Sequence, residues 1–397
     1  MSESDPSPQG ESNSAEQVGI GKFLRYFLWL GTFGFGGPIA AVGYMQRDLI
    51  EQRKWVDEQD FLNGVALGQT MPGPLAAQVT MWVGYLRRGA LGALMTAVPF
   101  ILPSFVLVLS IAFFYVRYEG LEWLQALFYG IAPGVMAIIA IAAIKLARLT
   151  NQKDARLWVI SAVIMVITVL TGAEIALLFI AAGLLMILWD APPRFLKRFL
   201  PGSSAGVFAF PLPALGLVLG TAALGTQVAL VLFFLKAGAF IFGSGLAIVP
   251  FLREGVVNQH QWLTERQFLD AVAMGLITPG PVVITAAFIG YLVGGFLGAV
   301  LSSVAIFTPI YLGVVIPGRW FIRHRDNLQL RAFVKGATAA AAGAIAGATI
   351  VLTQQAVVDI PTIAIALVSL VLLWRFKVKE PLIVLLAAVA GLILYFS

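Results

Sequence analysis

The sequence has no cysteine and only two histidines, His260 and His324. The first absence excludes disulfides, thiol nucleophiles and iron–sulfur clusters, and the second argues against a dedicated transition-metal site. No GxxxxGK[ST] nucleotide motif occurs, and no lysine- and arginine-rich run suits nucleic acid. We therefore expect that the protein is not an enzyme and that it has no cofactor and no nucleic-acid partner.

Charge is scarce as well. Charged residues make up 12% of the 397 residues and hydrophobic residues 59%, whereas soluble domains carry about 25% charged residues. The mean hydropathy is +0.91. A water-soluble chain of this size could not bury so much apolar surface, so the composition predicts an all-α polytopic membrane protein whose partner is the lipid bilayer.

Apolar runs recur along the chain, and we expect about 13 spans, of which the four shortest form two tight pairs. The polar, Pro- and Ser-rich residues 1–20 lack the apolar core of a signal peptide and are expected to form a disordered tail. The candidate spans are 22–45, 62–86, 90–115, 123–147, 157–172, 173–189, 205–224, 227–252, 269–291, 296–316, 334–353, 360–374 and 381–396.

The two halves of the chain resemble each other. Trp55 and Pro72-Gly73-Pro74 match Trp262 and Pro279-Gly280-Pro281 at an offset of 207 residues, and further identities follow in the same order. Ordered matches of this kind predict a duplicated protein. The expected parts are a first repeat at 21–198, a connecting span at 199–225 and a second repeat at 226–397.

Lysine and arginine mark the cytoplasmic loops of membrane proteins. The turn at Arg87-Arg88 is basic, but its equivalent around Leu292-Val293 is uncharged, and the next loop of the second half carries Arg319 and Arg323. Corresponding loops therefore have opposite charge character, which predicts that the two repeats are inverted relative to each other.

Both Pro-Gly-Pro segments lie near the middle of predicted spans. A proline in the first turn of a helix loses no hydrogen bond, so each segment is expected to end one half-helix and start another. The free N–H groups of residues 75–77 and 282–284 would then form an anion site at the positive ends of two helix dipoles. An ordinary kink, or a loop between shorter helices, is the alternative.

Polar residues and glycines around the breaks complete the candidate site. Lys236 lies inside a span, where a charge is costly and by default functional, although it could also snorkel to one face. The glycine-rich stretches could serve helix packing alone. The predicted substrate-binding residues are Gly36, Gly37, Gln69, Pro72, Gly73, Pro74, Gln78, Lys236, Gly243, Ser244, Thr278, Gly280, Pro281 and Thr285.

The loops 45–61 and 252–268 are polar and amphipathic, and we interpret them as interfacial helices anchored by Trp55 and Trp262. Charged residues near the proposed pathway could instead serve gating or proton coupling. These candidates are Asp48, Glu51, Arg53, Asp60 and Arg87.

Several motifs together resemble the chromate ion transporter family. They are FGFGGP at 33–38, Arg53, Trp55, QTMPGP with Gln78, Gly84 and Leu102-Pro103-Ser104, with a weaker copy in FGSG, Trp262, TPGP and Gly290-Tyr291. The resemblance covers the chain from about residue 22 and implies the long, two-domain form of the family. It implies export of chromate across the inner membrane of a bacterium, driven by the proton motive force and conferring chromate resistance, with sulfate as an isosteric competitor or alternative substrate.

The second half departs from the first in the family motifs, because Gly37-Pro38 becomes Ser244-Gly245, Gln78 becomes Thr285 and Arg53 becomes His260. The two half-sites are therefore not equivalent, and we expect the first to dominate binding. An importer of sulfate-like oxyanions or an anion channel remains an alternative, since direction depends on coupling. An intramembrane chromate reductase is disfavoured by the missing cysteine and nucleotide motif, and homodimer formation is left open.

Overall fold

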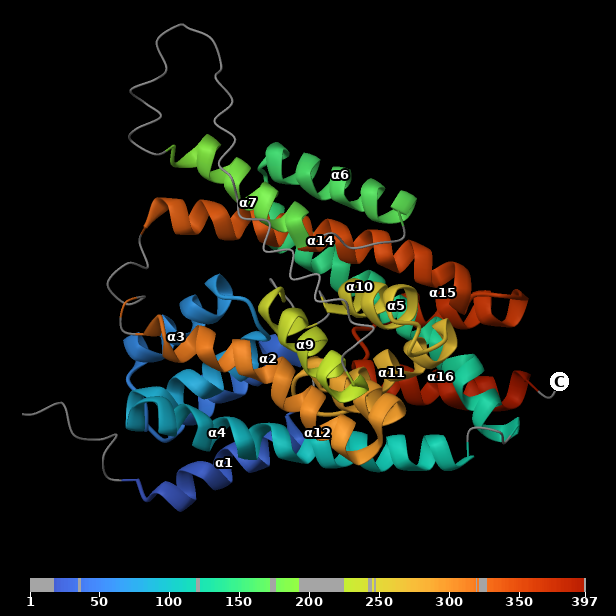
Figure 1. Cartoon of the computed structure of the whole chain (residues 1–397), viewed down its shortest axis with the longest axis horizontal. Helices are drawn as coiled ribbons and strands as arrows, with labels where there is room; N and C mark the ends of the chain where they lie inside the picture. Colours follow the sequence, from blue (N-terminus) through green and yellow to red (C-terminus); the bar gives the residue numbers. More distant parts are fainter. Residues whose placement is uncertain are drawn as a thin grey trace, which may run out of the picture.

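The computed structural model describes residues 18–34, 37–118, 122–171, 176–192, 225–241, 245, 248–318, 320 and 327–395, and these described residues are helical without strands. Most long helices run along the longest axis of the molecule (Figure 1). Four helical stretches, 75–118, 125–151, 282–315 and 328–356, are long and apolar enough to cross a membrane, and five shorter apolar helices accompany them. The chain is therefore a multi-pass all-α membrane protein.

The first half contains seven α-helices and one π-helix among the described residues. They are α1 (Ile20–Phe33), α2 (Gly37–Met45), the π-helix η1 (Gln46–Gln52), α3 (Glu58–Thr70), α4 (Leu75–Tyr118), α5 (Glu122–Asn151), α6 (Ala155–Thr171) and α7 (Ala176–Asp190).

The described part of the second half follows the same order. It contains α9 (Thr226–Ala239), α10 (Ile248–Arg253), the π-helix η4 (Glu254–Gln259), α11 (Glu265–Ile277), the 3₁₀-helix η5 (Val282–Ile284), α12 (Thr285–Val315), α14 (Leu328–Ala356), α15 (Ile360–Arg375) and α16 (Glu380–Leu394).

Both halves fold their longest apolar run into a tight hairpin. The turns lie at Arg88-Gly89 and Gly294-Gly295, where the second residue has a φ of 59° in α4 and 64° in α12. On the first hairpin the Thr96 hydroxyl donates to the Thr80 carbonyl at 2.9 Å, and on the second the Ser302 hydroxyl donates to the Ala286 carbonyl at 2.7 Å. The duplicated sequence therefore builds the same local structure twice.

The arms of each hairpin approach closely because glycines face each other. A Cβ added to Gly84 would lie 2.2 Å from the backbone oxygen of Gly92, and one added to Gly290 would lie 2.4 Å from that of Gly298. No side chain fits at such distances, so these four glycines serve helix packing.

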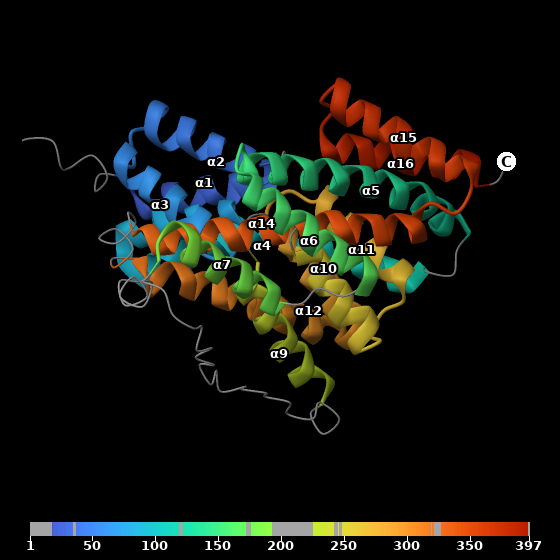
Figure 2. The same ribbon diagram turned by 90° about the horizontal axis from the view of Figure 1, so that it is seen from above.

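The ends of the two repeats exchange partners. Helices α6 and α7 pack on α14 of the second half, whereas α15 and α16 pack on α5 of the first half, beside which they lie in Figure 2. Helices α5 and α14 lie side by side and run in opposite directions: near the start of α5, Tyr129 donates to Asp359, just beyond the end of α14. The repeats are thus interlocked rather than separate bodies.

Three sequence predictions need revision or lie outside the described residues. The run 22–45 contains two helices, because α1 ends at Phe33 and Gly34 caps it. The loop 45–61 forms η1, and its Trp55 is only 8% exposed because it packs against Phe23 and Tyr26, so the interfacial-anchor interpretation of Trp55 is wrong. The connecting span at 205–224 lies outside the described residues.

Candidate functional site

The first Pro-Gly-Pro segment lies between α3 and α4. Gly73 has a φ of +143°, and its N–H donates to the carbonyl of Ile241 from the second half at 2.6 Å. A Cβ at Gly73 would lie 2.9 Å from the Gln78 side chain and 3.0 Å from that of Ile310. Both the backbone conformation and the close neighbours therefore require glycine here.

The second segment lies between α11 and α12 and has a reciprocal environment. Gly280 has a φ of +95°, and its added Cβ would lie 3.0 Å from the hydroxyl of Ser104. Ser104 and Ile310 follow the matched prolines Pro103 and Pro309. Each Pro-Gly-Pro glycine thus packs against the equivalent residue of the opposite repeat.

The two segments converge at Gly245. A Cβ placed there would lie 3.8 Å from the Cβ of Pro74 and 3.6 Å from that of Val282. The helix starts at Leu75 and Val282 therefore flank one glycine, and the first N–H groups of a helix have no partner within it. The prediction of free N–H groups at 282–284 is wrong for Ile284, because its N–H donates to the carbonyl of Pro281 at 3.0 Å in the tight 3₁₀ turn. Gly37 begins α2, while the predicted site residues Gly36, Gly243 and Ser244 lie outside the described residues.

The polar side chains at the two breaks are used differently. Gln78 is fully buried, and its amide nitrogen donates to the carbonyls of Pro72 at 3.0 Å and Met71 at 3.3 Å. Its side-chain oxygen is buried and has no hydrogen-bond donor among the described residues. Thr285 and Thr278 donate within their own turns, to Val282 at 2.8 Å and to Gly275 at 3.3 Å. Among the described residues, a long side chain bridges the first break and none bridges the second.

Two predicted binding residues lie elsewhere. Gln69 is exposed near the end of α3. Lys236 is exposed on α9, and its ammonium group lies 5.6 Å from the ring centre of Phe251. Burial lowers the pKa of His260, and the charge of Lys236 lowers it further. Among the described residues, Lys236 thus interacts with Phe251 of α10 and with His260 of the following loop, and no contact with the Pro-Gly-Pro segments is found.

A basic pocket lies between the start of α1 and η1 and contains two of the predicted gating residues, Asp48 and Arg53. Its volume is about 470 Å³. The Arg53 guanidinium lies 4.7 Å from the ring centre of Trp55 and 5.1 Å from that of Tyr26, and Arg47 pairs with Asp48 at 2.8 Å. The lining residues are Lys22, Arg25, Tyr26, Trp29, Arg47, Asp48, Gln52 and Arg53.

Lys22, Arg25 and Arg47 were not among the residues predicted from the sequence. A signal was present, because Lys22, Arg25 and Trp29 are spaced three and four residues apart and so share one face of a helix. Nothing in the sequence, however, indicated that this face would meet the loop containing Arg53.

The remaining predicted gating residues, Glu51, Asp60 and Arg87, do not line the basic pocket. Glu51 is exposed. Burial raises the pKa of Asp60, and the nearby Asp57 raises it further. Arg87 donates to the carbonyl of Val18, which places the basic Arg87-Arg88 turn beside the start of α1.

A buried carboxylate in the second half was also missed. Asp270 of α11 is 3% exposed and accepts a hydrogen bond of 2.7 Å from the hydroxyl of Tyr115 on α4. It lines two neighbouring cavities of about 360 and 190 Å³. The signal was its position, because Asp270 is the one acidic residue in the apolar run 269–291, and its counterpart is Asn63.

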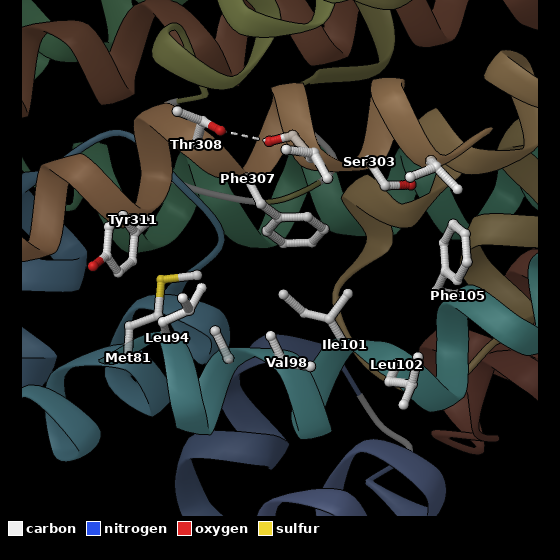
Figure 3. Close-up of a pocket in the computed structure, with 13 residues that line it drawn as sticks. Met81, Leu94, Val98, Ile101, Leu102, Phe105, Ser303, Phe307, Thr308 and Tyr311 are labelled. Atoms are coloured by element: carbon white, nitrogen blue, oxygen red, sulfur yellow. Dashed lines mark hydrogen bonds between the residues drawn. The ribbon is translucent and has the colours of Figure 1, made fainter. Parts of the chain in front are cut away.

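A further cavity, of about 310 Å³, is an apolar groove between α4 and α12. Figure 3 shows Ile101 and Phe307 pointing toward one another across it. These two residues are equivalent in the repeats, as are Phe105 and Tyr311, so the groove lies between matching faces. Its apolar walls cannot replace the water around a dianion, which argues against this groove as an anion site.

No cluster of three or more potential metal ligands occurs among the residues that the structure describes. The described residues instead place two helix starts and the buried Gln78 amide at the Pro-Gly-Pro breaks, and a separate basic pocket beside the start of α1.

Known proteins give a consistent result. The profile of the chromate transporter family matches residues 21–188 and again residues 228–392. The chromate transport protein of Cupriavidus metallidurans is 47% identical over 392 residues, covering 98% of this chain and 97% of that protein. The probable chromate transport protein of Synechococcus elongatus is 48% identical over 377 residues, covering 94% of this chain and 95% of that protein.

A shorter relative matches a single repeat. The uncharacterized transporter YwrA of Bacillus subtilis is 29% identical over 166 residues, which are 40% of this chain and 91% of that protein. No solved structure matches the chain. The double match of the family profile and the near full-length relatives lead to one conclusion: this chain belongs to the chromate transporter family, whose members are transport proteins and not enzymes.

Proposed function

We propose that this protein exports chromate, and the isosteric sulfate, from the bacterial cytoplasm across the inner membrane by alternating access. The observation that carries the proposal is the convergence of two helix starts at Gly245 in a member of the chromate transporter family. The N–H groups at the starts of α4 and of η5 supply donors for a tetrahedral dianion without adding buried charge. Gln78 supports the first of these helix starts.

The repeats are inverted in this proposal, and the antiparallel packing of α5 against α14 supports it. The proposed count of about 13 spans includes the run 205–224, which lies between the two repeats at 21–198 and 226–397. Each half would present one helix break to the common pathway. A rocking of one interlocked half against the other would then open the site to alternate sides.

Energetics favour export. Moving one elementary charge across a membrane potential of 100 mV changes its free energy by about 2.3 kcal/mol. A dianion that leaves a cell with a negative interior therefore releases about 4.6 kcal/mol at 100 mV. That free energy sustains a gradient of roughly 2,000-fold. The membrane potential alone can therefore drive export, and no proton carrier is needed to account for dependence on the proton motive force.

The test is chromate uptake by everted membrane vesicles energised by respiration. We expect saturable uptake that sulfate inhibits, that valinomycin with potassium abolishes, and that nigericin affects less. A Gly73→Val variant present in the membrane in equal amount serves as the inactive control. Faster chromate entry into intact cells, without energised uptake by vesicles, would overturn export in favour of an importer. Uptake that never saturates would favour a channel.

A further inference from the structure

The basic pocket of the first repeat is not explained by the helix breaks. Four cations, Lys22, Arg25, Arg47 and Arg53, line it, and Asp48 is its one carboxylate, so its formal charge is +3. Asp48 is only 4% exposed and is already paired with Arg47. The cavity thus keeps an excess of positive charge that the described residues do not neutralise.

Two features of the pocket indicate a built site rather than scattered surface charges. The Arg53 guanidinium stacks on Trp55 and Tyr26, which fixes its position while it makes no hydrogen bond or ion pair with the described residues. The hydroxyl of Tyr26 is buried, lies beside Asp48 and has no hydrogen-bond partner of normal length among them. Tyr26 is 3% exposed and also lines the pocket. A donor held in this way is expensive unless a ligand uses it.

The second repeat lacks every one of these features. The counterparts of the pocket residues Lys22, Arg25, Tyr26, Arg47, Asp48 and Arg53 are Ala229, Leu232, Phe233, Glu254, Gly255 and His260. The aromatic framework persists, since His260 stacks on Trp262 with ring centres 4.2 Å apart. Duplication therefore preserved the fold of this corner, while the cations and the hydroxyl occur in one copy only.

We propose that this pocket is a binding site for a tetrahedral oxyanion, where the anion is held before it reaches the helix breaks. The assignment rests on the proposed function for the identity of the anion, chromate or sulfate. Arg25, Arg53 and the Tyr26 hydroxyl supply the hydrogen-bond donors, and the charges of Lys22 and Arg47 add to the positive electrostatic potential in the pocket. The pocket lies beside the Arg87-Arg88 turn, because Arg87 donates to Val18 just before α1. Basic turns face the cytoplasm, so the site serves the loading side of an exporter.

The phosphate of an anionic lipid has the same chemistry, and the start of a membrane helix is a place where such lipids bind. The two sources differ in what they require. A free oxyanion can bind to the protein in a bilayer made only of zwitterionic lipid. An anionic lipid cannot occupy the pocket there, because such a bilayer contains none. The experiment therefore uses purified full-length protein in nanodiscs of phosphatidylcholine, with and without phosphatidylglycerol.

The first measurement is equilibrium dialysis of radiolabelled chromate against these nanodiscs. We expect Arg25→Gln and Arg53→Gln to weaken binding about tenfold each in pure phosphatidylcholine, and Tyr26→Phe to weaken it about threefold. Arg156→Gln is the control of equal charge change, because Arg156 lies outside the pocket and pairs with Asp154 and Asp190. Unchanged chromate binding, with only phosphatidylglycerol retention reduced, would overturn the oxyanion site in favour of a lipid site.

The second measurement is the chromate KM in everted vesicles at rising ionic strength. The wild-type KM should rise with salt, and the Arg25→Gln, Arg53→Gln double variant should show a higher KM, an unchanged kcat and a weaker salt dependence. A fall in kcat with unchanged KM and salt dependence would indicate a structural role and overturn the site. Chromate binding that depends on these residues without any energised transport would refute the proposed export and leave the site standing.

Discussion

The two repeats share their backbone architecture and differ in the side chains that line their outer ends. Both fold their longest apolar run into a hairpin that turns at a glycine, and both place a glycine with positive φ between two prolines. In both, a tryptophan in the loop after the π-helix stacks on another side chain. In the first repeat that tryptophan supports Arg53, and in the second it supports His260. The comparison teaches that duplication kept the framework in both copies, whereas the cations of the basic pocket occur in one copy only.

The contrast extends to the balance of charge. In the second repeat, Arg253 at the end of α10 donates from its Nε atom to the Glu265 carboxylate at 3.0 Å. Asp270 is buried nearby against Tyr115. The basic pocket of the first repeat thus keeps an excess of positive charge, whereas Arg253 of the second repeat is compensated by Glu265.

The largest effect should come from removing the glycines that the two repeats share. Gly73→Val and Gly280→Val each force a β-branched residue into a φ of +143° or +95° next to the opposite repeat. We expect chromate transport in everted vesicles to fall at least about 100-fold in both variants, because a displacement of about 1 Å at a binding site costs that much. Membrane insertion, measured by immunoblot of the membrane fraction, should be unchanged.

The matched control for these variants is Gly43→Ala in α2, because a Cβ there meets nothing within 4 Å. It should transport at the wild-type rate. Transport retained by Gly280→Val alone would confine the site to the first repeat and remove the symmetry from the mechanism. Transport retained by both variants would refute the convergence of helix starts as the anion site.

These glycines also show what the sequence can predict. Proline and glycine act on the backbone locally, so the Pro-Gly-Pro positions, the duplication and the all-α membrane class could be read from residue types and spacing. The division of the run 22–45 and the exchange of α6 and α7 onto α14 could not, because tertiary packing decides them. Spacing gives the depth of Lys236 along its span but not the face on which it lies.

The candidate site follows the same rule. Gln78 was predicted from its place one turn after Pro74, a local relation, whereas Lys22 and Arg53 meet only because Trp55 folds back beneath α1. Asp270 was detectable as an isolated acid in an apolar run, but its partner Tyr115 lies 155 residues away along the chain. Long-range pairs of this kind have no signal in a single sequence.

A smaller effect should separate the polar residues that support the two breaks. Gln78→Ala leaves the carbonyls of Pro72 and Met71 without their shared donor, a loss of about 1–3 kcal/mol that should lower the transport rate roughly tenfold. Thr285→Ala removes only a bond within its own turn and should cost about twofold or less. Initial rates of chromate uptake, normalised to protein in the vesicles, measure both. Equal losses in the two variants would contradict the unequal roles assigned to the half-sites.

The smallest effect concerns the two equivalent loops that contain Arg53 in the first repeat and His260 in the second. His260 has a pKa below its ordinary value of 6.5, because burial and then Lys236 disfavour its charged form, whereas its counterpart in the first repeat is Arg53. The unfolded chain therefore binds the proton more readily, and the folded state loses stability as the pH falls through about 6.5. His260→Gln removes this loss, so the drop in Tm between pH 8 and pH 5.5 should shrink by about 1–2 °C. Lys236→Gln should shrink it as well, and Arg53→Gln should not. A decrease in Tm that is identical in all three variants would mean that the loop with His260 contains no buried titrating group. The two loops would then differ in sequence but not in electrostatics.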